Sequence, residues 1–425
     1  MLNRTQQPPI KDAVDFDLTL TACDQFKLGN GTQVYAVNAG AEEVMMIELV
    51  FYAGNCFEQN NGVAPATNYL LKNGTTTKTA FQVNDHFEYY GAYLSRSCHN
   101  ETSSIVLHCL SRHLNVLLPV VREIINEAAF PEEEIGIFKQ NSRQRLAVNL
   151  QKCDFVANRL IDVSLYGAEH PYGKFSMPED YDALSGSLLK EFYHKFYQKG
   201  KCIIFAAGKL PNDYRDQLDK FFGDRHMDES IDFPVNNTDT ATEKKMRVQN
   251  DPDGVQGAIR IAQPFPNRHH PDFKKVMILN TLLGGFFGSR LMANIREEKG
   301  YTYGIHSYLQ NHLQQTAWMI STEAGKDVCE QTIEEVYKEM KILREEPVEE
   351  DELLLVKNYM MGTNLGELDG PFKIISRWKN LVLNNLDEKY FYDSMRTIKN
   401  ISAEELMALS NKYLLPEKFF ELVVI

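Results

Sequence analysis

The sequence predicts an α+β protein made of two tandem homologous domains, each a mostly antiparallel sheet with helices packed on one face. Three observations lead to this fold class. The chain has 425 residues, about three times the commonest single-domain size. Its two halves share an internal repeat. Within each half, strand-like apolar runs alternate with segments of helical periodicity.

The internal repeat consists of matching segments that lie about 217 residues apart. The matching pairs are Ser185 with Ser402, Pro131 with Pro347, and the apolar runs 201–207 with 418–424. Each serine begins a helix-like run, and each proline precedes a group of glutamates. Chance recurrence of common helix-start signals is the alternative explanation. Because all pairs keep nearly one offset, the repeat favours a duplicated domain.

The repeat divides the chain into a domain at 1–223, a polar linker at 224–254 and a second domain at 255–425. Along the chain, the expected strands are 44–52, 103–110, 201–207 and 258–261. The expected helices are 114–128, 132–150, 274–283, 328–343 and 351–365. Several begin with acidic residues, which the helix dipole favours in the first turn.

Charge and cysteine content exclude several classes of protein. Lys and Arg number 45 against 58 Asp and Glu, a net charge of −13 that leaves no excess of cations for nucleic acid and favours neutral or basic ligands. The seven cysteines include no C-x-x-C pair, which indicates reduced thiols. No stretch reaches the ~18 apolar residues that cross a bilayer. We therefore expect no membrane partner and a cytoplasmic location, or a periplasmic one if a signal peptide has been removed.

The segment 61–75 contains the first informative motif, Asn-Gly-Val-Ala-Pro-Ala-Thr-Asn-Tyr-Leu-Leu-Lys-Asn-Gly-Thr. It resembles the zinc-binding helix of the pitrilysin/insulinase-like (inverzincin) metallopeptidases, whose motif is roughly G-x-A-H-x-x-E-H-x-x-F-x-G-T. Pro65 stands where the resemblance places the first histidine ligand, Asn68 replaces the glutamate base, and Tyr69 replaces the second histidine. The resemblance extends from about Phe26 to Ile425.

These substitutions remove the chemistry of a catalytic zinc. Proline has no lone pair to donate, an amide takes no proton from water, and a phenol of pKa ~10 is a poor substitute for imidazole. The family also supplies a glutamate ligand about 75 residues later, and the window 144–148 contains no carboxylate. We therefore expect no metal or other cofactor in this chain, with zinc in a partner subunit.

The second motif lies in the other half and is intact. The segment 282–305 is similar to the family's second-domain signature, which includes an R-x6-Y pair, here Arg296 and Tyr303. Gly300 is the expected stop of the helix that contains Arg296. The resemblance implies that this pair holds the substrate backbone and stabilises the oxyanion, so we assign it catalytic and substrate-binding roles. Gly284 and Gly285 are predicted to form either a flexible substrate-facing loop, which would bind substrate, or a tight helix junction.

The leading hypothesis is a subunit without zinc that pairs with a zinc-bearing homologue, the two closing like a clamshell around a peptide. In this arrangement, Arg296 and Tyr303 act in trans on the partner's site. It resembles the Arg/Tyr-bearing chain of bacterial two-subunit peptidases and the alpha subunit of mitochondrial processing peptidase. The alternatives are a non-catalytic peptide-binding or scaffold protein, possibly homodimeric, and hydrolysis without this zinc site. The two motif residues also have a purely structural interpretation. Arg296 would then be a surface residue neutralised by Glu297 or Glu298, and Tyr303 would serve ordinary packing.

Overall fold

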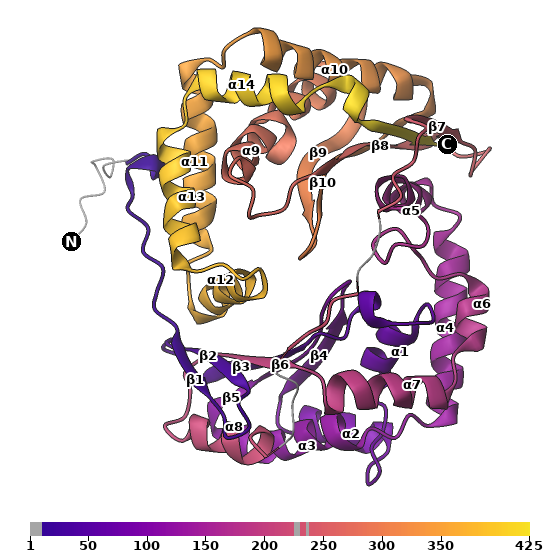
Figure 1. Ribbon diagram of the computed structural model, residues 1–425, viewed down its shortest axis with the longest axis vertical. Coiled ribbons are helices and arrows are strands. Elements are labelled where there is room, and N and C mark those ends of the chain that lie inside the picture. Colours follow the sequence, from indigo (N-terminus) through magenta and orange to yellow (C-terminus); the bar gives the residue numbers. More distant parts are fainter. Residues whose placement is uncertain (1–10, 225–229, 235–237) are drawn as a thin grey trace, which may run out of the picture. The chain divides into compact units, whose positions relative to one another are not determined.

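The computed structural model describes residues 11–224, 230–234 and 238–425, and it contains two β-sheets with helices around them (Figure 1). The predicted α+β class is confirmed. Parts of the predicted linker, residues 225–229 and 235–237, lie outside the described residues. Among the described helices, none is long and apolar enough to cross a membrane.

The first sheet has six strands in the order β1-β2-β6-β3-β5-β4. Their bounds are β1 Asp24–Lys27, β2 Gln33–Asn38, β3 Val44–Phe51, β4 Tyr93–Cys98, β5 Ser103–Leu110 and β6 Cys202–Gly208. Only β2 and β6 pair in parallel in this sheet; the other pairs are antiparallel. Strand β4 pairs with β5 at the end of this order and is therefore an edge strand.

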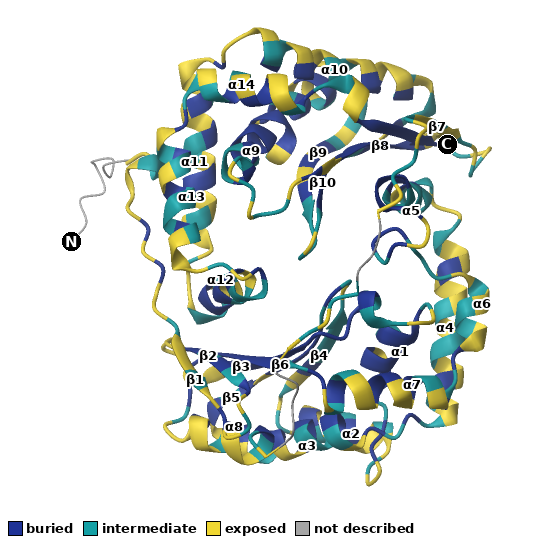
Figure 2. Cartoon of the chain, in the orientation of Figure 1, coloured by how far each residue is buried: buried dark blue, intermediate teal, exposed yellow. Residues whose placement is uncertain are grey.

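Helices cover one face of this sheet and form its core. Alternate residues of β3, namely Met45, Ile47, Leu49 and Phe51, point into that core, as the period of two in a strand requires. The helices that supply its other side are α1 Val63–Leu70, α2 Ala80–Tyr89, α3 Leu114–Glu127, α7 Gly186–Tyr193 and α8 Tyr214–Phe222. Figure 2 shows the buried residues along these strands and on the helix faces that cover them. The predicted packing of helices on one face is confirmed here.

Helix α12, Pro371–Leu383, contacts the opposite face of the same sheet. The Lys379 ammonium lies 2.9 Å from both carboxylate oxygens of Glu48, a nearly buried residue of β3. Near it, the rings of His108 and Phe372 lie 6.1 Å apart. A buried carboxylate is costly unless it is paired, so this ion pair explains a glutamate within an apolar strand.

The second sheet has five strands in the order β7-β11-β8-β10-β9. Their bounds are β7 Lys245–Val248, β8 Gln256–Phe265, β9 Thr302–Asn311, β10 Thr316–Gly325 and β11 Phe420–Val424. The nearby helices are α9 Phe273–Asn280, α10 Cys329–Glu345, α11 Glu350–Gly366, α13 Glu388–Asn400 and α14 Ala403–Tyr413. The remaining helices are α4 Glu132–Asn149, α5 Cys153–Tyr166 and α6 Pro178–Ala183.

Corresponding elements occupy the repeated segments. The Ser185 hydroxyl accepts a hydrogen bond from the Leu188 N–H at the start of α7, and the Ser402 hydroxyl accepts one from the Glu405 N–H at the start of α14. Each of these helices precedes a buried strand, β6 or β11. Both strands have a parallel neighbour, β2 or β7.

One predicted helix ends earlier than expected. The helix predicted at 274–283 is α9 to Asn280, followed by a π-helical turn, η5, at Thr281–Gly285. Gly284, inside η5, has a φ of −159°, which is not helical and marks a kink in the turn.

Contacts divide the chain into two compact units. One comprises Ala22–Arg260, Gly370–Asn380 and Phe420–Ile425. The other contains Ile261–Asp369, Leu381–Phe419 and the described residues before Ala22. This division by contacts differs from the division by sequence repeat, whose boundaries stay predictions.

Candidate functional site

Helix α1 contains the degenerate metal motif, and Pro65 occupies its first turn. The first N–H groups of a helix have no partner inside the helix, so the missing N–H of proline costs little here. The Glu58 carboxylate caps this end by accepting hydrogen bonds from the N–H groups of Gly62 at 3.2 Å and Ala64 at 2.7 Å. Burial raises the pKa of Glu58 to about 7.

Asn68 is a core residue. Its side chain is 3% exposed, and its amide donates hydrogen bonds to the Ser104 carbonyl at 3.3 Å and to the Tyr197 hydroxyl at 3.1 Å. Tyr197 is itself fully buried, and this burial raises its pKa. The position of the family's general base therefore carries an amide that joins α1 to β5 and to the turn that follows α7.

Tyr69 lies at the second ligand position and packs between two side chains. Its ring is 5.2 Å from that of Phe138 on α4, and the Arg96 guanidinium lies 4.9 Å from its centroid. Arg96 comes from the edge strand β4, and its Nη1 donates to the Tyr69 carbonyl and to Asn73 Oδ1. Burial lowers the pKa of Arg96 to about 10, so the group stays cationic at neutral pH.

These residues do not fit a zinc ion. Pro65 has no donor atom, Asn68 has committed its amide protons to core acceptors, and a guanidinium cation stands over Tyr69. Across the described ranges, there is no group of three His, Cys, Asp or Glu that could hold a metal. Likewise, no disulfide joins the cysteines of the described ranges, and burial raises the pKa of Cys56 and of Cys109 to about 12.

The second motif is built on a buried polar network. Ser307 of β9 accepts a hydrogen bond from Trp318 Nε1 at 2.8 Å and donates one to Asn280 Oδ1 at 2.7 Å. Asn280, at the end of α9, returns a bond to the Ser307 carbonyl at 3.1 Å. Side-chain bonds thus fix the turn η5 against β9, and such satisfied buried networks make a local structure rigid.

Arg296 lies in the π-helical turn η6, Met292–Glu298, and its guanidinium is partly exposed. The guanidinium carbon is 4.5 Å from the centroid of the Phe287 ring. Among the described residues, Arg296 makes no ion pair, so Glu297 and Glu298 do not neutralise it by direct contact. Gly300 then takes a φ of +68°, as expected for the stop after this helix.

Tyr303 is 90% exposed and lies at a β-bulge. Thr302 of β9 pairs with Ala324 of β10, and Ile305 pairs with Thr322. Two residues of β9, Tyr303 and Gly304, therefore lie opposite one residue of β10, Glu323. The Thr302 hydroxyl bonds the Thr322 hydroxyl at 2.8 Å and accepts from the Gly304 N–H at 3.1 Å, which fastens the bulge. Bulges re-aim a side chain, and this one presents Tyr303 to solvent. No hydrogen bond joins it to Arg296 in the described structure.

The two glycines of the motif differ in environment. Gly284 is buried, and a Cβ there would lie 2.8 Å from the Ser307 Cβ and 2.9 Å from its backbone nitrogen. Close packing of η5 on β9 therefore explains a glycine at this position. Gly285 is exposed, and its substrate-facing role stays a prediction.

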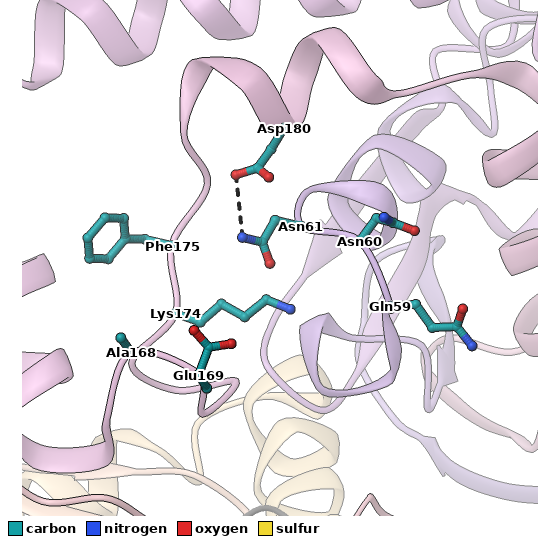
Figure 3. Close-up of a pocket in the computed structure, with 8 residues that line it drawn as sticks. All are labelled: Gln59, Asn60, Asn61, Ala168, Glu169, Lys174, Phe175 and Asp180. Atoms are coloured by element: carbon teal, nitrogen blue, oxygen red, sulfur yellow. Dashed lines mark hydrogen bonds between the residues drawn. The ribbon is translucent and has the colours of Figure 1, made fainter.

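A polar cavity of about 370 Å³ opens beside the N-terminal end of α1 (Figure 3). Asn61 donates a hydrogen bond to Asp180 Oδ2 at 3.3 Å across one wall. The other lining residues are Gln59, Asn60, Ala168, Glu169, Lys174 and Phe175. The cavity contains none of the predicted site residues.

Sequence reasoning missed Arg96 and Phe287. Arg96 lies 27 positions after Tyr69 and on another element, and no local spacing links the two. Phe287 lies inside the second motif, where an aromatic residue in a glycine-rich segment was an available signal.

The comparisons with known proteins agree with this architecture. Residues 183–360 match the family described as the peptidase M16 inactive domain. The crystal structure of a peptidase M16 inactive domain from Pseudomonas fluorescens has a TM-score of 0.83 at 22% identity, and covers 95% of this chain and 98% of its own. A protease from Helicobacter pylori has a TM-score of 0.86 at 15% identity, with 95% and 99% covered. The fold is thus of the pitrilysin type.

Sequence relatives extend the match over most of the chain. The uncharacterized zinc protease YmxG of Bacillus subtilis is 22% identical over 355 residues, which is 82% of this chain and 85% of the relative. The beta subunit of the mitochondrial-processing peptidase of Rattus norvegicus is 23% identical over 369 residues, which is 82% of this chain and 73% of the relative. Residues 183–360 are therefore similar to the inactive-domain family, and most of the chain is similar in sequence to these peptidase relatives. This confirms the resemblance seen in its motifs, and the match to a family described as inactive supports a peptidase-like component.

Proposed function

We propose that this chain is the non-zinc-binding subunit of a two-subunit peptidase. Its Arg296 and Tyr303 contact the substrate backbone and the oxyanion at the site of a zinc-bearing homologous partner. The observation that carries the proposal is the state of these two side chains. Among described residues, both lack a hydrogen-bonded protein partner, both are accessible, and both come from locally fixed backbone.

The chemistry follows from the two groups. A guanidinium is a fixed cation with five N–H donors, and a phenol offers one O–H donor. Donors held toward a developing negative oxygen stabilise the transition state more than the substrate, because the charge appears only during reaction. Phe287 supports the Arg296 guanidinium from one side, which limits its orientations at low entropic cost.

The residues of the degenerate metal motif support the proposal that another subunit supplies the zinc. At α1, the Asn68 amide is hydrogen-bonded to the core, and the Tyr69 ring packs against Phe138 and Arg96. Hydrolysis therefore needs a second chain that supplies the metal and the base. The rat relative is, by its name, one subunit of a processing peptidase.

The test is reconstitution with a homologue that carries an intact H-x-x-E-H motif. We expect a stable heterodimer that cleaves unstructured peptides, with each chain inactive alone. Arg296→Ala or Tyr303→Phe is expected to lower turnover by about 100-fold without loss of pairing, as removal of one oxyanion donor does in other hydrolases. Tyr308→Phe, a less exposed tyrosine of the same strand, is the control and should leave turnover unchanged.

Two results would overturn the proposal. Unchanged turnover in both variants would remove the catalytic role of the pair. A stable homodimer that binds peptides and rejects every zinc-bearing homologue would favour a non-catalytic binding or scaffold protein instead.

A further inference from the structure

The π-helical turn η6, which contains Arg296, is joined to the neighbouring helix α10 by a buried side chain. Asn294 is 8% exposed, and its Nδ2 donates hydrogen bonds to Glu335 Oε2 at 2.9 Å and to Glu339 Oε1 at 2.7 Å. The two glutamates are four residues apart on α10 and therefore lie on one face of that helix. One amide group thus joins η6 to α10 two residues before Arg296.

The Glu335 carboxylate also contacts the chain on the other side of Arg296. Its second oxygen, Oε1, forms an ion pair with Lys299 Nζ at 4.0 Å. Lys299 follows η6 directly and lies three residues after Arg296. The two oxygens of one carboxylate therefore contact residues before and after Arg296, which limits the movement of the segment between them.

The two carboxylates determine the orientation of the Asn294 amide. Carboxylates only accept hydrogen bonds, so the amide presents its nitrogen to them, and its Oδ1 is buried without a hydrogen-bond partner among the described residues. The hydrogen bond from Asn294 lowers the pKa of Glu335, so this acceptor is charged at neutral pH. A charged acceptor strengthens a hydrogen bond, whereas a buried oxygen without a partner costs free energy. The contact with α10 therefore outweighs the cost of the unpaired oxygen.

The backbone of η6 depends on the same residue. The Lys299 N–H donates to the Asn294 carbonyl, five residues earlier, at 3.0 Å, and the Tyr301 N–H donates to the Ile295 carbonyl at 3.0 Å. A bond over five residues is the pattern of a π-helical turn, which is rare and occurs frequently at functional sites. Asn294 therefore anchors the turn twice, through its backbone carbonyl and through its side chain.

We propose that Asn294 and Glu335 are positioning residues that hold the Arg296 guanidinium where it contacts the substrate oxyanion. This role rests on the proposed function of Arg296 and adds the residues through which the chain fixes it. The Phe287 ring, 4.5 Å away, supports the guanidinium itself, whereas Asn294 and Glu335 fix the backbone from which the side chain extends. Placement matters because a displacement of about 1 Å lowers a rate by as much as ~100-fold.

The first test is a double-mutant cycle on the pair reconstituted with a zinc-bearing homologue. Glu335→Ala and Asn294→Ala are each expected to lower turnover by about tenfold, and Glu335→Gln, which keeps an oxygen acceptor for Asn294, by less. Glu334→Ala removes the same charge from an exposed neighbouring position of α10 and should leave turnover unchanged. In an Arg296→Ala background, Glu335→Ala should have almost no further effect, because it acts through Arg296.

The second test uses the isolated full chain and needs no partner. Hydrogen exchange, measured by mass spectrometry on fragments that contain the Lys299 and Tyr301 amides, reports the opening of η6. These fragments should exchange about tenfold faster in Glu335→Ala and Asn294→Ala, and at the wild-type rate in Glu334→Ala. Thermal unfolding checks that every variant is folded.

The outcomes separate this inference from the proposed catalytic role. Wild-type exchange in both alanine variants would overturn the inference, and so would losses of turnover that add to that of Arg296→Ala. If Arg296→Ala lowers turnover but Glu335→Ala and Asn294→Ala do not, only the positioning role is wrong. If Arg296→Ala itself leaves turnover unchanged, the catalytic proposal is wrong, and the exchange measurement still decides whether Asn294 and Glu335 hold η6.

Discussion

The α1 region and the η6–β9 region each carry a family motif, but their polar side chains bind different things. At α1, Asn68 donates both amide protons to core acceptors, and Arg96 binds a backbone carbonyl. At η6–β9, the buried bonds belong to Ser307 and Asn280, while Arg296 and Tyr303 project beyond them. In the first region, Asn68 at a motif position is itself hydrogen-bonded into the core. In the second region, the buried hydrogen bonds are made by other residues, Ser307 and Asn280, which fix the backbone near Arg296 and Tyr303.

This difference predicts that substitutions in the two motifs will have different effects on stability. A side chain whose bonds are all internal contributes to stability, and its replacement is felt in folding. A side chain without an internal partner contributes little to stability, so its retention points to a ligand. Three stability measurements test this contrast.

The largest effect is expected for Asn68→Asp. A carboxylate at this buried position faces the Ser104 carbonyl and loses both donated hydrogen bonds, so we expect about 3 kcal/mol or more of lost stability at pH 7. Chemical denaturation followed by circular dichroism measures it, and the loss should shrink in acid as the carboxyl becomes protonated. Asn141→Asp, on the exposed part of α4, is the matched control. Equal stability of the two variants would contradict a core role for Asn68.

The same reasoning bears on repair of the metal motif. Introduction of His, Glu and His at 65, 68 and 69 should create no peptidase activity. The glutamate would replace the buried amide, and no carboxylate ligand stands at 144–148. Zinc-dependent activity in this triple variant would contradict the conclusion that the α1 region does not fit a zinc ion.

Gly284→Ala tests the framework under the second motif. The added Cβ would collide with the backbone of β9, which cannot move without breaking the Ser307 bonds, so we expect a loss of about 1–3 kcal/mol. Gly366→Ala near the end of α11 meets nothing within 4 Å and should be neutral or slightly stabilising. If Gly284→Ala has wild-type stability, η5 does not pack on β9 as described.

The smallest effect concerns Glu58 and pH. Burial raises the pKa of this carboxyl to about 7, so between pH 4.5 and 7 the folded chain holds a proton that the unfolded chain has lost. Its contribution to stability is therefore complete below about pH 4.5 and is lost as the pH rises through 7. Glu58→Gln should therefore become progressively more stable relative to wild type as the pH rises from 5 to 8. Thermal unfolding of both proteins at the two pH values measures this, and a constant difference would contradict the shifted pKa.

Much of the fold was predictable because it depends on local patterns. The strand at 103–110 and the helices at 114–128 and 132–150 match β5, α3 and α4 within about a residue at each end. Their apolar spacing and caps act over a few positions and can be read directly. The π-helical turns η5 and η6 were not predicted, and η5 packs closely on Ser307 of β9, a contact between separate elements.

The candidate site was predictable only in part. The sequence by itself determined which chemical groups stand at the motif positions: no metal ligands at 65, 68 and 69, and an arginine and a tyrosine at 296 and 303. Only the tertiary structure decided which groups are bound internally and which are accessible. Arg96 reaches Tyr69, and Asn68 reaches Ser104 and Tyr197, across separate elements. Such pairings depend on how strands and helices pack, and no spacing along the chain encodes them.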